Sequence, residues 1–87
     1  MRSMKASLEI SLYPLNEEYK PAIHSFIKRL DEHKDVDVIP NTMSTQVFGE
    51  LDDIMPVLHK EIEKSWKDYG RSVFVCKFLK GDRRPDA

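Results

Sequence analysis

Leu8-Glu9-Ile10-Ser11-Leu12-Tyr13 carries the clearest structural signal in the chain. Apolar residues alternate in this stretch with residues that carry a carboxylate or a hydroxyl group. A period of two is typical of a β-strand that buries one face and leaves the other face open. We therefore predict a strand from Lys5 to Tyr13, which Pro14 ends because proline lacks the N–H that a strand ladder needs.

Two helical patterns follow this strand. Apolar residues recur at helical spacing between about Tyr19 and His33, which predicts a first amphipathic helix. A second, longer pattern starts beside Asp52 and Asp53, whose charges suit a helix N-terminus, and stops at Gly70, which readily takes a left-handed conformation. The apolar stripe of this second helix is predicted to contain Leu51, Ile54, Met55, Leu58, Ile62, Trp66 and Tyr69.

Three further β patterns lie between and after the helices. Val36–Ile39 predicts a short strand, and residues 40–42 predict a turn because they combine proline and asparagine. Met43–Phe48 predicts a second strand of the same hairpin, with Gly49 as its end. Ser72–Leu79 predicts the last strand.

The resulting order is β-α-β-β-α-β, which predicts an α+β protein of the ferredoxin-like class. In this sandwich two right-handed crossovers place both helices on one face of a four-stranded antiparallel sheet. The first and third strands are then central, and the last strand lies at an edge. We predict a single domain over residues 1–80 and a solvated C-terminal tail over residues 81–87.

Charge and cysteine content exclude several classes of protein. Lys and Arg number 14 against 15 Asp and Glu, so the chain lacks the basic excess typical of nucleic-acid-binding proteins. The lone Cys76 cannot form an internal disulfide, which suits a reducing compartment. Neither a signal peptide nor a membrane-spanning segment is expected. The sequence therefore predicts a cytoplasmic protein with no nucleic-acid or membrane partner.

The last predicted strand is apolar on both faces, although it should lie at the edge of the sheet. Strands of this kind are normally covered on both sides. Because the chain offers no third layer, a second copy is the natural cover, and we predict a homo-oligomer, a dimer or a tetramer. One face carries Val73, Val75 and Leu79, and the other carries Phe74, Cys76 and Phe78.

Residue spacing gives little support for metal binding or covalent chemistry. His24, His33 and His59 do not pair at helical spacing, and His59 with Glu63 would offer a metal only two ligands. Cys76 lies between two phenylalanines, where it suits a small core side chain better than a nucleophile. We therefore predict no catalytic residue, no metal site and no cofactor, and expect that the protein is not an enzyme.

Polar side chains are unusually frequent on the two strands that should be central. Such groups pair with one another, face a wet oligomer interface or meet a ligand. From the residues alone, a solvated or interfacial face is favoured slightly over a binding site. The set comprises Glu9, Ser11, Tyr13, Asn41, Thr42, Ser44, Thr45 and Gln46.

Three stretches resemble the YkoF-like family of thiamine- and hydroxymethylpyrimidine-binding proteins, and in particular its short single-domain members. They are Leu8–Leu15, Asn41–Glu50 and Val73–Phe78, and the similarity extends from about Ser7 to Arg84. The resemblance implies a ferredoxin-like fold, oligomers built from sheet contacts, and a pocket for the pyrimidine of the thiamine precursor.

The resemblance points first to Ser44 and Thr45 as ligand-binding residues, and next to Ser11 and Asn41. Hydroxyl and amide groups can pair with the amino group and ring nitrogens of an aminopyrimidine. Strand parity, however, places Ser44 on the face opposite to Thr45.

Four other candidates rest on chemistry. Glu9 would accept the amino hydrogens or offset a positive thiazolium, and Gln46 would pair with the ring. Tyr13 or Phe48 would cover the ring face. The sequence thus predicts a non-catalytic protein that binds thiamine or its hydroxymethylpyrimidine moiety. The alternative is an oligomeric interaction or structural module without a small ligand.

Overall fold

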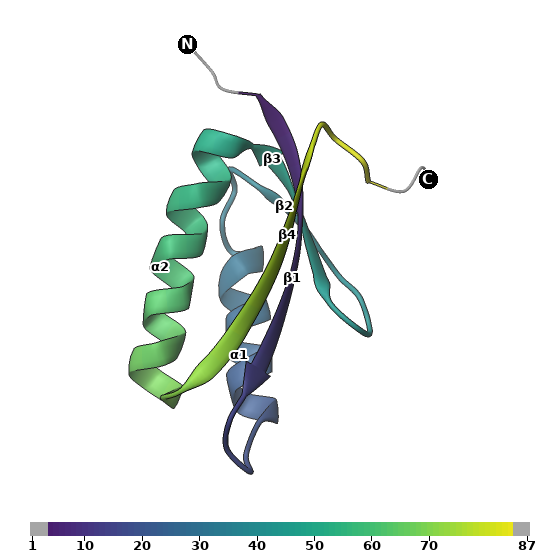
Figure 1. Cartoon of the computed structure of the whole chain (residues 1–87). Coiled ribbons are helices and arrows are strands. Elements are labelled where there is room, and N and C mark those ends of the chain that lie inside the picture. The colour runs from purple at the N-terminus through teal and green to yellow at the C-terminus, as the bar shows by residue number, and fades with distance from the viewer. Residues whose placement is uncertain (1–3, 85–87) are drawn as a thin grey trace.

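Six elements form the fold predicted from the sequence, in a computed structural model that describes residues 4–84. The antiparallel sheet has the order β2-β3-β1-β4, and both helices cover one of its faces (Figure 1). Residues 1–3 of the predicted domain and residues 85–87 of the predicted tail lie outside the described range. The elements are β1 (Lys5–Pro14), α1 (Lys20–Asp31), β2 (Asp37–Pro40), β3 (Thr45–Glu50), α2 (Leu51–Tyr69) and β4 (Ser72–Lys80).

The core lies between the helices and the inner face of the sheet. Leu8 and Ile10 point into it from β1, as the alternating pattern predicts, and each is 2% exposed. Leu30 of α1 and Ile54 of α2 are fully buried against the same layer. Burial of each such side chain contributes about 1.5–3 kcal/mol. Within residues 4–84, neither helix has the length and hydropathy needed to cross a bilayer.

Gly49 does not end β3, contrary to the sequence prediction. The strand continues to Glu50, and Gly49 pairs with Ala6 of β1. A Cβ atom at this position would lie 3.4 Å from the carbonyl oxygen of Asp35. That is an ordinary van der Waals distance, so the space around the position does not require glycine, and Gly49 is a paired residue of β3.

The β2–β3 hairpin turns later than predicted. Pro40 still pairs with Thr45, and the backbone N–H of Asn41 donates to the carbonyl of Ser44 at 2.8 Å. The turn therefore comprises residues 41–44. Since Thr45 is also the first residue of β3 that pairs with β1, the hairpin tip extends beyond the paired part of the sheet.

The buried face of α2 differs in part from the predicted stripe. Met55 and Trp66 are 48% and 51% exposed, whereas Glu61 and Ser65 are buried. The helix is rotated so that these two polar residues face α1, where Arg29 bonds to both. A polar pair across the helix interface cannot be read from an apolar periodicity.

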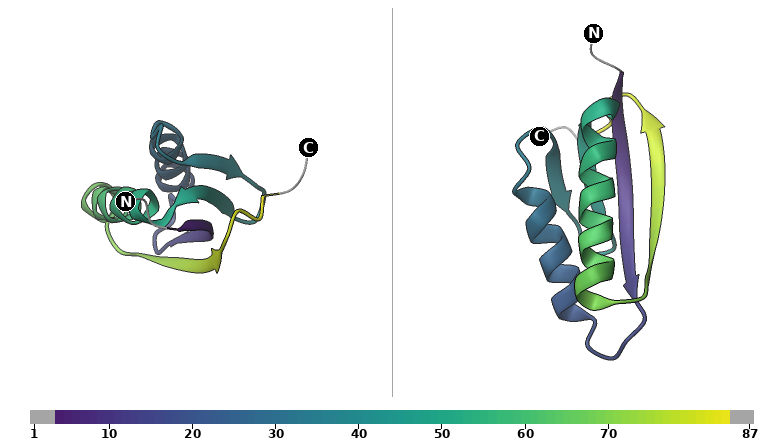
Figure 2. Two further views of the ribbon diagram at one scale, coloured as in Figure 1. Left: turned by 90° about the horizontal axis from the view of Figure 1, so that it is seen from above. Right: turned by 90° about the vertical axis from the view of Figure 1, so that its left-hand side faces the viewer.

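Residues 81–84, the C-terminal strap, are not simply a solvated tail. They cross the face of the sheet that the helices leave open, from β4 past β1 toward β3 (Figure 2). The hydroxyl of Ser7 donates to the carbonyl of Gly81 at 2.7 Å and accepts from the backbone N–H of Arg83 at 2.8 Å. One buried side chain on β1 therefore holds the strap against the sheet.

Arg84 extends the strap to the far strands. Its guanidinium lies 4.9 Å from the ring centroid of Phe48 and 3.0 Å from a carboxylate oxygen of Asp37. Phe48 points to the open face, yet it is 1% exposed. The strap thus covers one end of the open face and leaves the other end free.

The substitution Ser7→Ala should lower the free energy of unfolding by about 1–2 kcal/mol, because two part-buried hydrogen bonds are lost. Urea denaturation followed by circular dichroism measures this change. Ser72→Ala, at the start of the same sheet's edge strand, is the matched control and should change stability by less than about 0.5 kcal/mol. Equal stability of the Ser7→Ala variant and the unchanged protein would contradict the role given to the strap.

Candidate functional site

A small cavity lies where the hairpin tip diverges from β1. β1 pairs with β3 only as far as Ile10, and its last four residues, Ser11–Pro14, pair with β4 alone. Between this end of β1, the 41–44 turn and α1 is a space of about 120 Å³, the hairpin cavity. Figure 1 shows the tip of the hairpin bending away from the helices.

The floor of the hairpin cavity is apolar. Leu12 contributes to it from β1, and Ile23, Phe26 and Ile27 contribute from one face of α1. An apolar cavity of about 150 Å³ is known to accept benzene. The hairpin cavity, at about 120 Å³, is somewhat smaller, so it can take part of one planar ring and cannot enclose a molecule of two rings.

Five of the eight predicted binding residues line this cavity. Thr45 is 4% exposed and faces inward, Ser44 is half-buried, and Tyr13 is 55% exposed at the rim. Because three separate segments converge here, these side chains can act on one ligand. The five are Ser11, Tyr13, Asn41, Ser44 and Thr45.

Ser44 and Thr45 both border the cavity, and they keep the opposite faces that strand parity predicts. Thr45 pairs with Ile10 on the helix side of the sheet, whereas the hydroxyl of Ser44 bonds to Glu9 on the open face. Gln46, the second residue of β3, also lies on the open face.

Glu9 and Gln46 are directly opposite each other on the open face, outside the cavity. Glu9 accepts a hydrogen bond from the Ser44 hydroxyl at 3.0 Å and lies 3.6 Å from the Lys77 ammonium group. Gln46 accepts from the side-chain amide of Asn41 at 2.9 Å. Both predicted residues therefore act on cavity residues and do not line the cavity themselves.

Phe48 cannot cover a ring bound in the hairpin cavity, as the sequence analysis suggested it would. It pairs with Ser7, three register positions from the pair Ile10–Thr45 that borders the cavity. That separation is about 10 Å along a strand. The ring of Phe48 lies instead beneath Arg84.

Sequence reasoning missed the contribution of α1 and of Met43, and it named Thr42 only as a polar residue of the turn and not as a binding residue. Thr42 and Met43 border the cavity, and Met43 is 87% exposed. Ile23 and Ile27 are only half-buried on either side of the buried Phe26. The signal in the sequence was the wide apolar face of α1, because the sheet does not cover all of its apolar residues.

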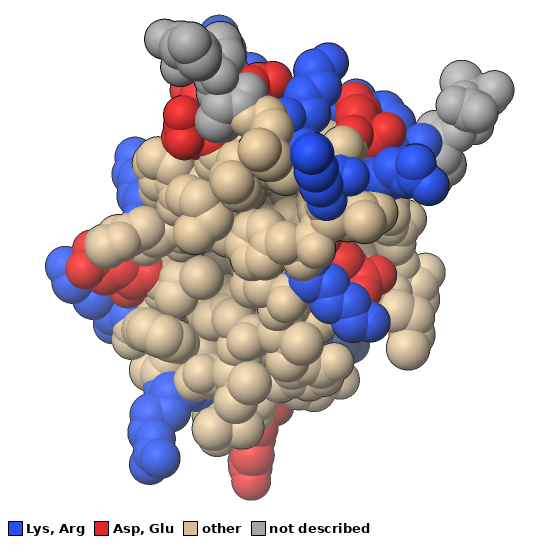
Figure 3. Space-filling model, turned by 45° about the horizontal axis from the view of Figure 1, so that its top comes forward, with Lys and Arg blue, Asp and Glu red and all other residues tan. Residues whose placement is uncertain are grey.

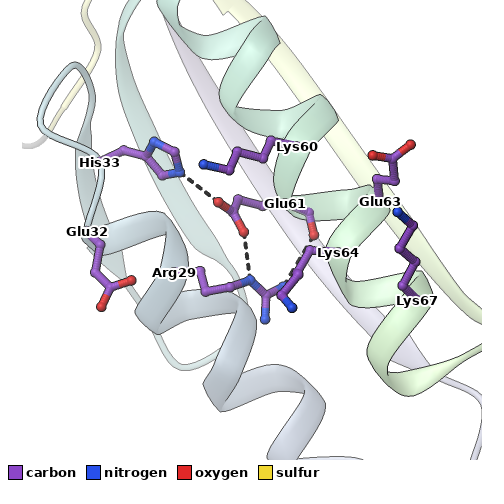
Figure 4. Close-up of a pocket in the computed structure, with 8 residues that line it drawn as sticks. All are labelled: Arg29, Glu32, His33, Lys60, Glu61, Glu63, Lys64 and Lys67. Atoms are coloured by element: carbon purple, nitrogen blue, oxygen red, sulfur yellow. Dashed lines mark hydrogen bonds and ion pairs between the residues drawn. The ribbon is translucent and has the colours of Figure 1, made fainter.

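A second hollow of about 530 Å³ lies between the helices (Figure 4). Glu61 accepts there from Arg29 Nε at 2.6 Å and is 2.7 Å from His33 Nε2. Arg29 also donates to the hydroxyl of Ser65 at 2.6 Å. Since the buried charges satisfy one another, this cluster joins the two helices.

Burial raises the pKa of Glu61, but the hydrogen bonds from His33 and Arg29 outweigh it and hold the pKa below its usual value.

The thiol of Cys76 is affected in the opposite direction, because burial raises its pKa and keeps it protonated. Within residues 4–84, no three His, Cys, Asp or Glu side chains come together in a way that could hold a metal ion.

The lowered pKa of Glu61 predicts a loss of stability in acid. The stabilisation is fully present above the ordinary glutamate pKa and disappears as the pH falls through the lowered value in the folded protein. Glu61→Gln should cost about 1.5–3 kcal/mol at pH 7, because charged hydrogen bonds are lost. It should also flatten the fall in unfolding free energy between pH 7 and pH 3.

Urea denaturation across this pH range measures both effects. Glu63→Gln, an exposed position on the same helix, is the control and should keep the pH dependence of the unchanged protein. A Glu61→Gln variant with that same pH dependence would show that the cluster does not titrate as described.

No family model and no curated protein matches the sequence. Among solved structures, a hypothetical protein from Methanocaldococcus jannaschii is 27% identical with a TM-score of 0.75, over 100% of this chain and 86% of that one. A protein from Streptococcus pneumoniae is 23% identical with a TM-score of 0.83, over 91% and 89%. These likenesses establish that the fold recurs in other proteins.

A third similar structure is a candidate thiamine biosynthesis or salvage protein from Thermotoga maritima. It is 18% identical with a TM-score of 0.78, over 92% of this chain and 84% of that one. At this identity the likeness shows a shared fold.

Proposed function

We propose that this protein binds the aminopyrimidine ring of thiamine, or of its hydroxymethylpyrimidine precursor, in the hairpin cavity and releases it unchanged. The observation that carries the proposal is the convergence of hydroxyl and amide side chains from β1 and the 41–44 turn on a cavity of about 120 Å³. A flat nitrogen heterocycle has the shape and the hydrogen-bonding edge that such a cavity can satisfy.

The two sides of the cavity match the two sides of an aminopyrimidine. Phe26 and its aliphatic neighbours on α1 offer an apolar surface to the ring face. Ser11, Ser44 and Thr45 offer hydroxyl groups, which pair with amino hydrogens and ring nitrogens. The ring is thus held by packing on its face and by hydrogen bonds on its edge.

The rest of a thiamine molecule would extend past the rim. Tyr13 is more than half exposed there, so its ring is available to a positive thiazolium. A cation over an aromatic face contributes about 0.5–2 kcal/mol. Thiamine and its precursor would both place the pyrimidine at the cavity, with their remaining groups at or beyond the rim.

The lining groups support binding without chemical change. They are hydroxyls, a carboxamide and hydrocarbons, which hold a ligand by hydrogen bonds and packing. The fold shared with a candidate thiamine biosynthesis or salvage protein supports a thiamine-related role. Together with the resemblance of Leu8–Leu15 and Asn41–Glu50, it favours membership of the short YkoF-like proteins.

Isothermal titration calorimetry with hydroxymethylpyrimidine and with thiamine tests the proposal. Thr45→Val should weaken binding by about 1–3 kcal/mol, because a buried hydrogen bond is lost while the side-chain shape is kept. Ser72→Ala, away from the cavity, should bind as the unchanged protein does. Absence of heat with both ligands at millimolar concentration would reject the proposal and favour an interaction module without a small ligand.

We also propose that the open face of the sheet forms a homo-oligomer. β4 exposes Val73, Val75 and Leu79 on that face at 46%, 45% and 53%. Phe78, on the helix side of the same strand, is 48% exposed. Figure 3, which views the molecule from the β4 edge of the sheet, shows an area without charged side chains, with Lys, Arg, Asp and Glu around its margin. An apolar area of this kind is typical of an interface.

Val75→Asp should convert the oligomer to a monomer at micromolar concentration, because it places a charge in the proposed interface. Size-exclusion chromatography with light scattering gives the mass. Lys28→Asp, on the exposed side of α1, is the control and should leave the mass unchanged. A monomeric mass for the unchanged protein would overturn the proposal.

A further inference from the structure

The hydrogen-bond partner of Ser44 determines what its hydroxyl can offer to a ligand. Ser44 Oγ lies 3.0 Å from Glu9 Oε2. An ionised carboxylate has no hydrogen to give and can only accept. The hydroxyl of Ser44 must therefore donate its single hydrogen to Glu9, and its lone pairs remain for any group inside the hairpin cavity.

The other polar neighbours of Glu9 lie outside the cavity. Its other carboxylate oxygen is 3.6 Å from Lys77 Nζ, and Lys77 is its cross-strand neighbour on β4. Gln46 stands opposite it on β3. The carboxylate can thus orient Ser44 without contacting a ligand in the cavity.

The side-chain amide of Asn41 also presents a hydrogen-bond acceptor. Its side-chain nitrogen donates to Gln46 Oε1 at 2.9 Å and to the carbonyl of Ile39 at 3.5 Å. With the nitrogen engaged, the carbonyl oxygen of the same side chain is left to accept. Two of the polar groups at the hairpin end of the cavity therefore present acceptors.

We infer that the hairpin cavity selects heterocycles with an exocyclic amino group over their oxo counterparts, because Glu9 fixes Ser44 as a hydrogen-bond acceptor. An amino group supplies the hydrogen that Ser44 and Asn41 can accept. A carbonyl at the same ring position has no hydrogen to donate, and its lone pairs repel those of Ser44 and Asn41. Glu9 is a positioning residue for this selectivity. The inference rests on the proposed function and adds to it the feature of the ligand that is recognised.

Calorimetry with two ligands tests the inference: 4-amino-5-hydroxymethyl-2-methylpyrimidine and the same compound with oxygen in place of the 4-amino group. The unchanged protein should bind the amino compound at least about tenfold more tightly, as expected when one buried hydrogen bond is replaced by a repulsive contact. Ser44→Ala should lower this ratio chiefly by weakening binding of the amino compound.

Glu9→Ala has a signature that a merely structural role would not produce. Without its carboxylate partner, the Ser44 hydroxyl can rotate and donate into the cavity. Binding of the oxo compound should therefore strengthen while binding of the amino compound weakens, so that the ratio falls severalfold. Glu63→Ala, on the exposed side of α2, is the matched control and should keep the ratio.

The outcomes separate this inference from the proposed function. Equal binding of both compounds by the unchanged protein would overturn the selectivity and leave pyrimidine binding intact. A Glu9→Ala variant with an unaltered ratio would overturn the positioning role of Glu9. Failure of both compounds to bind would reject the proposed function, and the inference with it.

Discussion

The early end of pairing between β1 and β3 is the constraint on which the site depends. The ladder stops at Ile10 and Thr45, while β1 continues along β4 to Pro14. The hairpin tip is therefore free to diverge, and the space that it leaves is floored by α1. If β3 had started two residues earlier, backbone pairing between the two strands would have closed the gap that the cavity occupies.

The open face of the sheet is divided between two structural roles. At one end the strap covers Phe48, with Ser7 and Arg84 holding it in place. At the other end Glu9 and Gln46 bond to residues of the turn. Glu9 and Gln46 on this face are therefore in direct hydrogen-bond contact with residues that line the cavity.

The helix layer shows how polar contacts override apolar periodicity. The cluster around Glu61 is absent from any hydrophobic pattern, since its members lie far apart in the chain and gain their partners only when α1 and α2 pack. The same packing explains why Met55 and Trp66 of the expected stripe are half exposed. Periodicity identifies that a helix is amphipathic, but the partner helix decides its final rotation.

The order of elements, the central position of β1 and β3, and the inward direction of Leu8 and Ile10 were determined by the sequence alone, because alternation and helical spacing are local properties. Ser44 and Thr45 were singled out by the resemblance of their stretch to a known family, and not by periodicity. Only the tertiary structure decided that both border one cavity, that Glu9 bonds to Ser44 from the open face and that Phe48 does not reach the cavity. Those facts depend on where a strand ladder stops and on which distant segments then meet, and no local pattern records either.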